Sequence, residues 1–227
     1  MLASASNKGV LKIWEIKGKS LVQMTEFTQK SNISSLSYND DQGILYLGTT
    51  SGQLFFLKIR SVIGKPELLA GTGKAVTAVA VSHDGKYLAA GLTTGLIQIF
   101  NTENPAKDRV DLIGHISAVT SLDFNVNDNT LASCSYDKTI RLWNFREAAT
   151  PPVVIEDNDK WVYGIAFSAD QQKIVSCGAD KTIRIFGINT VKLSGKICSI
   201  VKRNLSDIEW NKYIGEDIPY HKTCNNH

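Results

Sequence analysis

The sequence predicts an all-β fold built from repeated units, each of them a small antiparallel sheet. A large apolar residue recurs every 43 residues, at the end of an alternating apolar run. These residues are Trp14, Leu57, Phe100, Trp143 and Phe186. A fixed period of about 40–45 residues is typical of one supersecondary unit repeated along the chain. Short alternating runs between polar turns point to the same class.

Each unit contains four predicted strands. The first strand begins at Ile33, Val76, Val119 and Val162 in successive units. The second begins at Leu2, Leu45, Leu88, Leu131 and Ile174, and the third ends at the residue that defines the period. A weaker fourth strand fits residues 110–113 and 152–156. Turn segments such as His83-Asp84-Gly85-Lys86 separate the strands. Four strands in 43 residues correspond to one blade of a β-propeller.

The fourth unit carries the clearest motif. It begins with Gly114-His115, continues through VTSLDF and ends with LASCSYDKTIRLWN. This unit resembles a WD repeat, which has a Gly-His pair, an Asp between its second and third strands, and a closing Trp. The resemblance implies a structural tetrad of His115, Ser135, Asp137 and Trp143, with Ser133 as the alternative hydroxyl.

The other units match the WD pattern less fully. The fifth unit keeps Asp180 but has Asn158 where His would fall, and Phe186 in place of Trp. The shared register over residues 2–187 nevertheless supports the fold. We predict propeller blades over residues 1–190, divided as 1–27 (partial), 28–71, 72–114, 115–157 and 158–190, followed by a helical tail over 191–227.

About five blades fit this chain. Because WD propellers commonly have about seven blades, we expect a truncated ring whose missing blades precede Met1. Open sheet edges favour association, so self-association is a further expectation.

The tail contains a predicted helix. Ser206 and Glu209 have the spacing of a capping box, with Leu205 and Trp210 placed as a hydrophobic staple. The helix would end near Gly215. The four positions Leu193, Ile197, Ile200 and Val201 also have helical spacing.

The tail also resembles a segment that follows the last propeller blade in bacterial signal-transduction NTPases with numerous domains (STAND proteins). The matching residues are Cys198, Arg203, Asn204, Leu205, Ser206, Glu209, Trp210, Tyr213, Gly215, Pro219, Tyr220, Thr223 and Cys224. The resemblance implies the C-terminal end of a larger protein with an upstream effector domain. The pairing of Cys198 with Cys224 stays open, although a reducing cytosol favours free thiols.

Composition excludes several classes of function. The net charge is +3, and no run of five like charges suggests a nucleic-acid tail or a polybasic membrane anchor. The sequence has neither a signal peptide nor an apolar stretch of membrane-spanning length, and we expect a cytoplasmic location. Cys134 and Cys177 occupy one strand position in adjacent units, where buried free thiols are expected. No spacing indicates a metal or cofactor site.

Two patterns resemble catalytic motifs. His115, a Ser and Asp137 together suggest a hydrolase, but the WD tetrad gives them a structural role. Gly71-Thr72-Gly73-Lys74 lacks the earlier Gly and the following Ser or Thr of a phosphate-binding loop. We therefore predict no enzymatic activity, with a propeller hydrolase using His115 as base kept as an alternative.

The candidate partner-binding residues are aromatic. Trp161 and Tyr163 replace Ala118 and Thr120 of the previous unit, and Tyr136 precedes the turn. Tyr and Trp are enriched in interface hot spots, so a protein partner on the top face of the propeller is one interpretation; packing between blades is the other. Arg141 and Arg184 are expected to be solvated or rim residues. The leading hypothesis is a non-catalytic protein-interaction or sensor module, with a stand-alone scaffold as the second.

Overall fold

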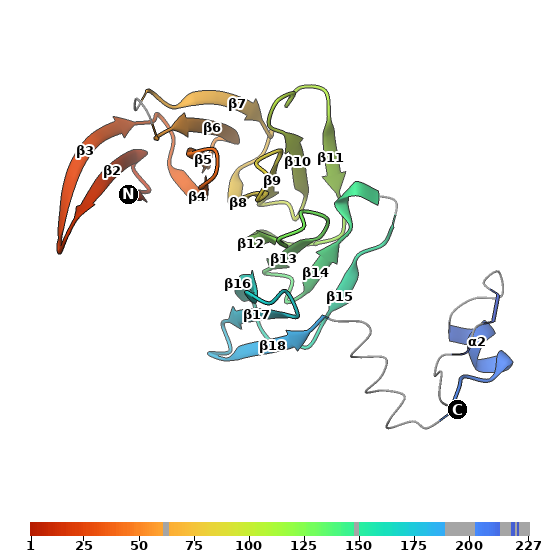
Figure 1. Ribbon diagram of the computed structural model, residues 1–227. Helices are drawn as coiled ribbons and strands as arrows, with labels where there is room; N and C mark the ends of the chain where they lie inside the picture. Colours follow the sequence, from red (N-terminus) through yellow and green to blue (C-terminus); the bar gives the residue numbers. More distant parts are fainter. Residues whose placement is uncertain (61–63, 148–149, 189–202, 214–218, 221, 223–227) are drawn as a thin grey trace.

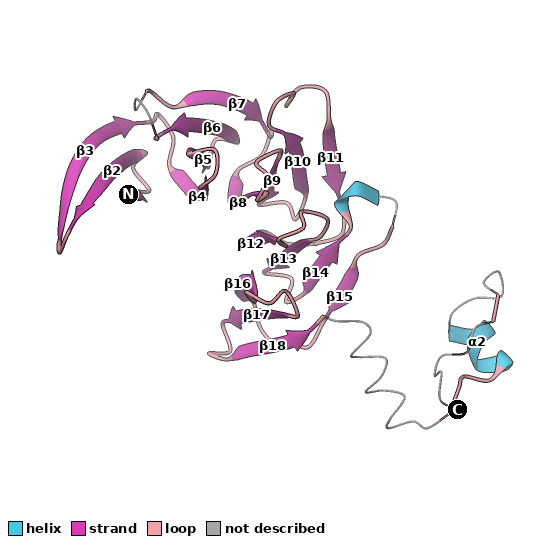
Figure 2. Ribbon diagram, in the orientation of Figure 1, coloured by secondary structure: helices cyan, strands magenta, loops and turns pink. Residues whose placement is uncertain are grey.

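The computed structural model describes residues 1–60, 64–147, 150–188, 203–213, 219–220 and 222. Within this part the chain forms five antiparallel sheets, and strands predominate (Figure 2). The strands in chain order are β1 (Leu2–Ala5), β2 (Val10–Lys17), β3 (Ser20–Thr28), β4 (Ile33–Asn39), β5 (Ile44–Thr49), β6 (Gln53–Lys58), β7 (Glu67–Gly71), β8 (Val76–Val81), β9 (Tyr87–Leu92), β10 (Ile97–Asn101), β11 (Arg109–Leu112), β12 (Val119–Phe124), β13 (Leu131–Ser135), β14 (Ile140–Trp143), β15 (Val153–Ile155), β16 (Val162–Phe167), β17 (Lys173–Gly178) and β18 (Ile183–Gly187).

Each sheet is built from consecutive strands. The first sheet holds β1–β3, the second β4–β7, the third β8–β11, the fourth β12–β15 and the fifth β16–β18. The sheets follow one another around an open arc in Figure 1. The all-β prediction and its repeated antiparallel sheets are confirmed.

The turn between the second and third strands has the same backbone in all five sheets. Residues 9, 52, 95, 138 and 181, spaced 43 apart, all have positive φ. Glycine adopts this conformation without strain, and the first three positions are glycines. At Gly95 a Cβ would also lie 2.3 Å from the His115 carbonyl oxygen. Lys138 and Lys181 adopt the same left-handed conformation with side chains present.

Hydroxyl groups join the inner strands of neighbouring sheets. The Ser34, Thr77 and Thr120 side chains donate to the carbonyl oxygens of Val76, Val119 and Val162, at 2.6, 2.5 and 2.6 Å. Because the donors are 43 residues apart, β4, β8, β12 and β16 meet in one repeated geometry. The core consists of apolar clusters between adjacent sheets, such as the one that joins Leu122 and Phe124 of β12 to Ala78 and Ile97 of the third sheet.

In the part of the chain that the structure describes, two short helical elements accompany the strands. The 3₁₀ helix η1 (Phe145–Glu147) follows β14 and was not expected from the sequence. The helix α2 (Asp207–Tyr213) begins where the capping box predicts. The Ser206 N–H donates to Glu209 Oε2 (2.9 Å), and the Glu209 N–H donates to Ser206 Oγ (3.3 Å).

Some predictions fall on residues outside the described part of the chain. They are the predicted helix end near Gly215, the helical spacing of residues 193–201 and the pairing of Cys198 with Cys224. The proposed domain boundary at residue 190 also lies there and stays a prediction. In the described residues, no helix has both the length and the apolar character needed to cross a membrane.

The expectation of two buried cysteines is wrong for one of them. Cys134 is buried, whereas Cys177 is exposed. Cys134 belongs to an apolar cluster with Val162 and Ile165 of the fifth sheet, which covers it. Cys177 lies in the last described sheet, so no following sheet of the described chain covers its face.

Candidate protein-interaction site

A continuous chain of hydrogen bonds fixes one end of the fourth sheet. His115 Nδ1 lies 2.7 Å from Asp137 Oδ2, and His115 Nε2 lies 2.8 Å from Ser133 Oγ. The Trp143 indole N–H donates to the same Ser133 Oγ, also at 2.8 Å. Since an ionised carboxylate only accepts, Nδ1 carries the imidazole proton and Nε2 accepts the Ser133 hydroxyl. Every polar atom in this chain therefore has a partner.

The hydroxyl in this chain is Ser133, and the prediction of Ser135 is corrected. Both side chains point to the same face because they lie two residues apart in β13. Ser135 ends the strand, where its hydroxyl donates to the Ser117 carbonyl (3.0 Å) and accepts the Asp137 N–H (3.0 Å). Ser133 lies deeper, within reach of the Trp143 indole.

Hydrogen bonds keep the Asp137 carboxylate ionised in its buried site. Burial by itself raises the pKa of Asp137, but hydrogen bonds from His115 and from the Thr139 N–H and hydroxyl outweigh this effect. The net pKa lies well below the usual range of an aspartate. The Ile116 N–H also donates to this carboxylate (3.1 Å). Asp137 thus ties the turn before β14 to the loop that precedes β12.

This Ser–His–Asp arrangement resembles a hydrolytic triad in its distances. A nucleophile must also be reached by its substrate. The side chains of His115 and Asp137 are 0% and 1% exposed, and Ser133 is buried. The geometry therefore favours the structural role over the hydrolase alternative at this position.

The aromatic residues singled out from the sequence lie together on the surface. The ring centroids of Tyr136 and Trp161 are 5.1 Å apart, and those of Tyr136 and Tyr163 are 6.2 Å apart. Their exposed fractions are 40%, 52% and 47% for Tyr136, Trp161 and Tyr163. We call these three residues the aromatic cluster. It joins a turn of the fourth sheet to the entry strand of the fifth.

Backbone hydrogen bonds position the aromatic cluster. The Tyr136 N–H donates to the Ala118 carbonyl (3.1 Å), and the Ala179 N–H donates to the Trp161 carbonyl (2.8 Å). These two hydrogen bonds are equivalent, because both the donors and the acceptors lie 43 residues apart in successive sheets. The repeated backbone therefore brings together side chains that are 25 residues apart in sequence. Ile116, which is 88% exposed, lies on the same loop as Ala118 and adds to the exposed apolar surface.

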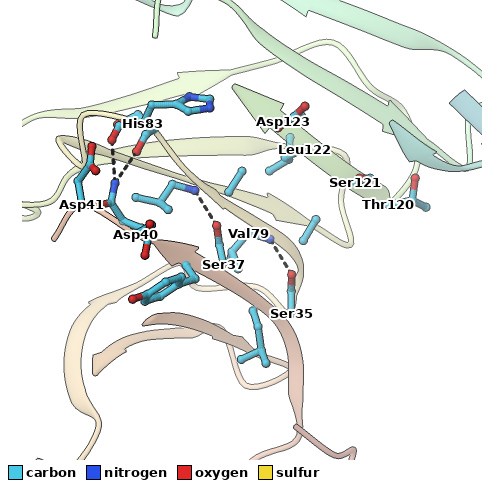
Figure 3. Close-up of a pocket in the computed structure, with 17 residues that line it drawn as sticks. Ser35, Ser37, Asp40, Asp41, Val79, His83, Thr120, Ser121, Leu122 and Asp123 are labelled. Carbon is cyan, nitrogen blue, oxygen red and sulfur yellow. Dashed lines mark hydrogen bonds between the residues drawn. The ribbon is translucent and has the colours of Figure 1, made fainter. Parts of the chain in front are cut away.

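A second candidate region is a cavity of about 600 Å³ along the inner strands β4, β8 and β12 (Figure 3). Its polar side chains largely serve contacts between sheets. Ser35 and Ser37 accept the N–H groups of Val79 and Val81, both at 3.0 Å. Asn39 donates to the carbonyls of the next turn, at 3.0 and 2.9 Å.

Asp123 also lines this cavity, and burial raises its pKa. The carboxylate accepts the Phe167 N–H of the fifth sheet at 2.7 Å. In the described chain, no group of three His, Cys, Asp or Glu side chains could hold a metal ion. The inner cavity is therefore better explained as a junction between sheets than as a reaction site.

The Gly71–Lys74 segment has a structural arrangement. β7 ends at Gly71, and the Thr72 hydroxyl contacts the carbonyls of Gly52 (3.1 Å) and Lys74 (2.7 Å). These contacts close a turn between the second and third sheets.

The two arginines expected at the rim differ in their contacts. Arg184 pairs with Asp180 and also contacts Thr182. Arg141 is half-buried, and its guanidinium carbon lies 5.9 Å from the Trp143 ring. Arg141 is thus less exposed than a freely solvated side chain, and the expectation of a rim position stays a prediction. The sequence contains one indication that the two arginines differ. The fourth unit has His115, which binds the turn aspartate Asp137, whereas the fifth unit has Asn158 at this position.

Comparison with known proteins agrees with this architecture. The family model "WD domain, G-beta repeat" matches residues 66–101, 107–144 and 150–187. The chain is also similar to "Cilia- and flagella-associated protein 251" of Pongo abelii, with 29% identity over 90 residues, which is 39% of this chain and 8% of that protein. The matched segments run from β7 to β18, so this part of the chain is similar to WD repeats.

Proposed function

We propose that this chain is a non-catalytic protein-interaction module whose aromatic cluster contacts a protein partner. WD domains generally serve as interaction modules rather than catalysts. The observation that carries the proposal is the contact between Tyr136, Trp161 and Tyr163 on the surface. Each ring is 40–52% exposed, although aromatic rings of this size contribute large free energies when buried. Such residues are enriched among interface hot spots.

The rigid scaffold beneath the cluster supports a role in recognition. Loops held by a stable framework commonly carry binding residues. Here the hydrogen-bond chain of His115, Ser133, Asp137 and Trp143 fixes the turn that carries Tyr136. A preorganised surface loses less conformational entropy when a partner binds.

The finer proposal is that the chain is the C-terminal propeller of a larger signalling protein of the bacterial STAND type. It rests on the tail motif alone, since the Pongo abelii relative matches only 90 residues of this chain. The stand-alone scaffold remains the second candidate. The gene sequence upstream of Met1 separates them, because a nucleotide-binding domain there would support the signalling protein. The predicted cytoplasmic location stays a prediction.

The aromatic cluster can be tested by matched capture. The wild-type chain, the double variant Y136A/W161A and the control Y38A would be immobilised and exposed to a lysate of the source cells. Tyr38 is 43% exposed, lies on β4 and is outside the aromatic cluster. We expect some proteins to bind the wild-type chain and Y38A equally but not Y136A/W161A. The binding of each such protein would then be verified by titration with the purified protein. An identical set of bound proteins on all three chains would refute the proposal.

A further inference from the structure

A cavity of about 360 Å³ opens beside the aromatic cluster. Its polar lining residues are Asp137, Lys138, Thr139, Arg141, Glu156 and Asn158. The chain connects it closely to the cluster, since Lys138 lies two residues after Tyr136 and Asn158 lies three residues before Trp161.

Two of the residues that line the cavity carry a buried hydrogen-bond donor without an acceptor. Arg141 Nε and Asn158 Nδ2 are both buried and unpartnered. Asn158 is only 8% exposed. Buried polar groups are normally satisfied, and an unpaired one costs about 1–3 kcal/mol. Two unpaired donors in one cavity therefore indicate an acceptor that comes from outside the described chain.

The charge of Arg141 is also unbalanced. Within the described residues, no carboxylate lies within ion-pair distance of its guanidinium group. Its guanidinium carbon lies 5.9 Å from the centroid of the Trp143 ring. Gly114 leaves space for this arrangement, because a Cβ there would lie 2.6 Å from Arg141 Nη1.

The repeat explains why these two donors are left over. In the fifth sheet, the equivalent Arg184 pairs with the turn aspartate Asp180. In the fourth sheet, the turn aspartate Asp137 is already bound by His115 and Thr139, so Arg141 has no acceptor. Asn158 occupies the position of His115 one repeat later, where its shorter side chain leaves its amide donor unpaired.

We propose that this cavity binds a carboxylate, supplied by an acidic side chain of the protein partner that contacts the aromatic cluster. Arg141 provides a planar guanidinium that matches a carboxylate in shape and charge. Asn158 provides the amide donor, and the exposed Lys138 adds positive charge at the rim. Because Nε and Nδ2 are shielded from solvent, binding requires both the Arg141 and the Asn158 side chains to turn toward the carboxylate. The proposal rests on the proposed interaction function and names the chemistry of the partner.

Glu156 sets the selectivity of the cavity. It lines the same space as Arg141 but forms no ion pair with it. Together with Asp137, it places two carboxylates in the wall. Both oppose anions, and the repulsion grows with the charge of the ligand. A singly charged carboxylate is therefore favoured over a phosphate group.

Nuclear magnetic resonance titration of the full chain with propionate, a mimic of the glutamate side chain, tests the proposal. Propionamide serves as the neutral control, inorganic phosphate as the competing anion, and sodium chloride keeps the ionic strength constant. We expect saturable shifts of the Arg141 Nε–H and Asn158 amide signals, with a Kd on the order of 10 mM. Propionamide should cause no such shifts, and phosphate should bind more weakly.

Variants identify the residues that bind. Arg141→Gln should abolish the saturable shift of the Asn158 amide, whereas Arg184→Gln, the equivalent position one repeat later, should leave it unchanged. Glu156→Gln should tighten propionate binding by about threefold, since a nearby like charge is removed. If Arg141→Gln does not fold, Asn158→Leu supplies the same test through the Arg141 signal.

Three results would overturn the proposal: no saturable shift with propionate, equal shifts with propionamide, or tighter binding of phosphate. The double variant Y136A/W161A separates this proposal from the proposed function. It should bind propionate normally while it loses the protein partner. If the Arg141→Gln variant still binds the partner while the Y136A/W161A variant does not, the carboxylate site is refuted and the proposed function is retained.

Discussion

Removal of the Ser133 hydroxyl should destabilise the fourth sheet far more than removal of its equivalent one repeat later. Ser133 Oγ accepts the Trp143 indole N–H and donates to His115 Nε2, each at 2.8 Å. Ser133→Ala leaves both groups buried without this partner. Each loss costs about 1–2 kcal/mol, so we expect the free energy of unfolding to fall by about 2–4 kcal/mol.

Ser176 provides a matched control. It is 43 residues after Ser133, is also buried, and its hydroxyl has no hydrogen-bond partner among the residues that the structure describes. The fifth sheet has Phe186 in place of Trp and Asn158 in place of His, so Ser176 lacks both partners. Ser176→Ala should therefore change the stability by no more than about 0.5 kcal/mol.

Urea unfolding, followed by circular dichroism, measures both variants. The slope of free energy against urea should stay constant while the midpoint shifts. A double-mutant cycle of Ser133→Ala with Trp143→Phe should show a coupling energy of about 1 kcal/mol, because both substitutions remove the same hydrogen bond. Equal losses of stability in Ser133→Ala and Ser176→Ala would refute the reasoning.

Three further outcomes follow from the same region. The pKa of Asp137 is lowered by folding, so its contribution to stability is complete above the unfolded-state pKa of about 3.9 and is lost as the pH falls toward the lowered value. Asp137→Asn should flatten the decline of the thermal midpoint below about pH 4, and an unchanged decline would contradict this. Burial raises the pKa of the Cys134 thiol to about 12, whereas Cys177 is exposed. Maleimide should label Cys177 in the folded chain and Cys134 only in urea, as peptide mass spectrometry can check; rapid labelling of folded Cys134 would be inconsistent with its burial. Gly114→Ala should lower stability by about 1–3 kcal/mol, since its methyl group would lie 2.9 Å from Cη2 of the buried Trp143 ring as well as 2.6 Å from Arg141 Nη1. An unchanged urea midpoint would show that the guanidinium moves away freely.

The strands could be predicted because two independent periods coincide in the sequence. Alternation of polarity indicates a strand, and the 43-residue spacing repeats each strand at the same position. The five positive-φ turn positions follow the same spacing, although the last two carry Lys138 and Lys181 rather than glycine. Backbone geometry is thus repeated more faithfully than the residues that adopt it.

Side-chain partners could not be predicted with the same success. Ser133 and Ser135 have the same orientation in β13, and only the reach of the Trp143 indole distinguishes them. Likewise, Cys134 and Cys177 occupy equivalent positions, but a neighbouring sheet covers only Cys134. In both cases the outcome depends on the distance to a segment elsewhere in the chain, which sequence periodicity does not contain.

Equivalent residues in this chain acquire different roles because their neighbours have different partners. The first sheet retains one bond of the tetrad, since the Trp14 indole donates to Ser4 Oγ at 2.9 Å. The fourth sheet completes the tetrad and thereby leaves its arginine without an acceptor. The fifth sheet lacks the His and the Trp, and its arginine pairs with the turn aspartate instead. An intact motif therefore stabilises its own sheet and also leaves a charged group available for binding, so the best-matched repeat is where we expect the partner to be recognised.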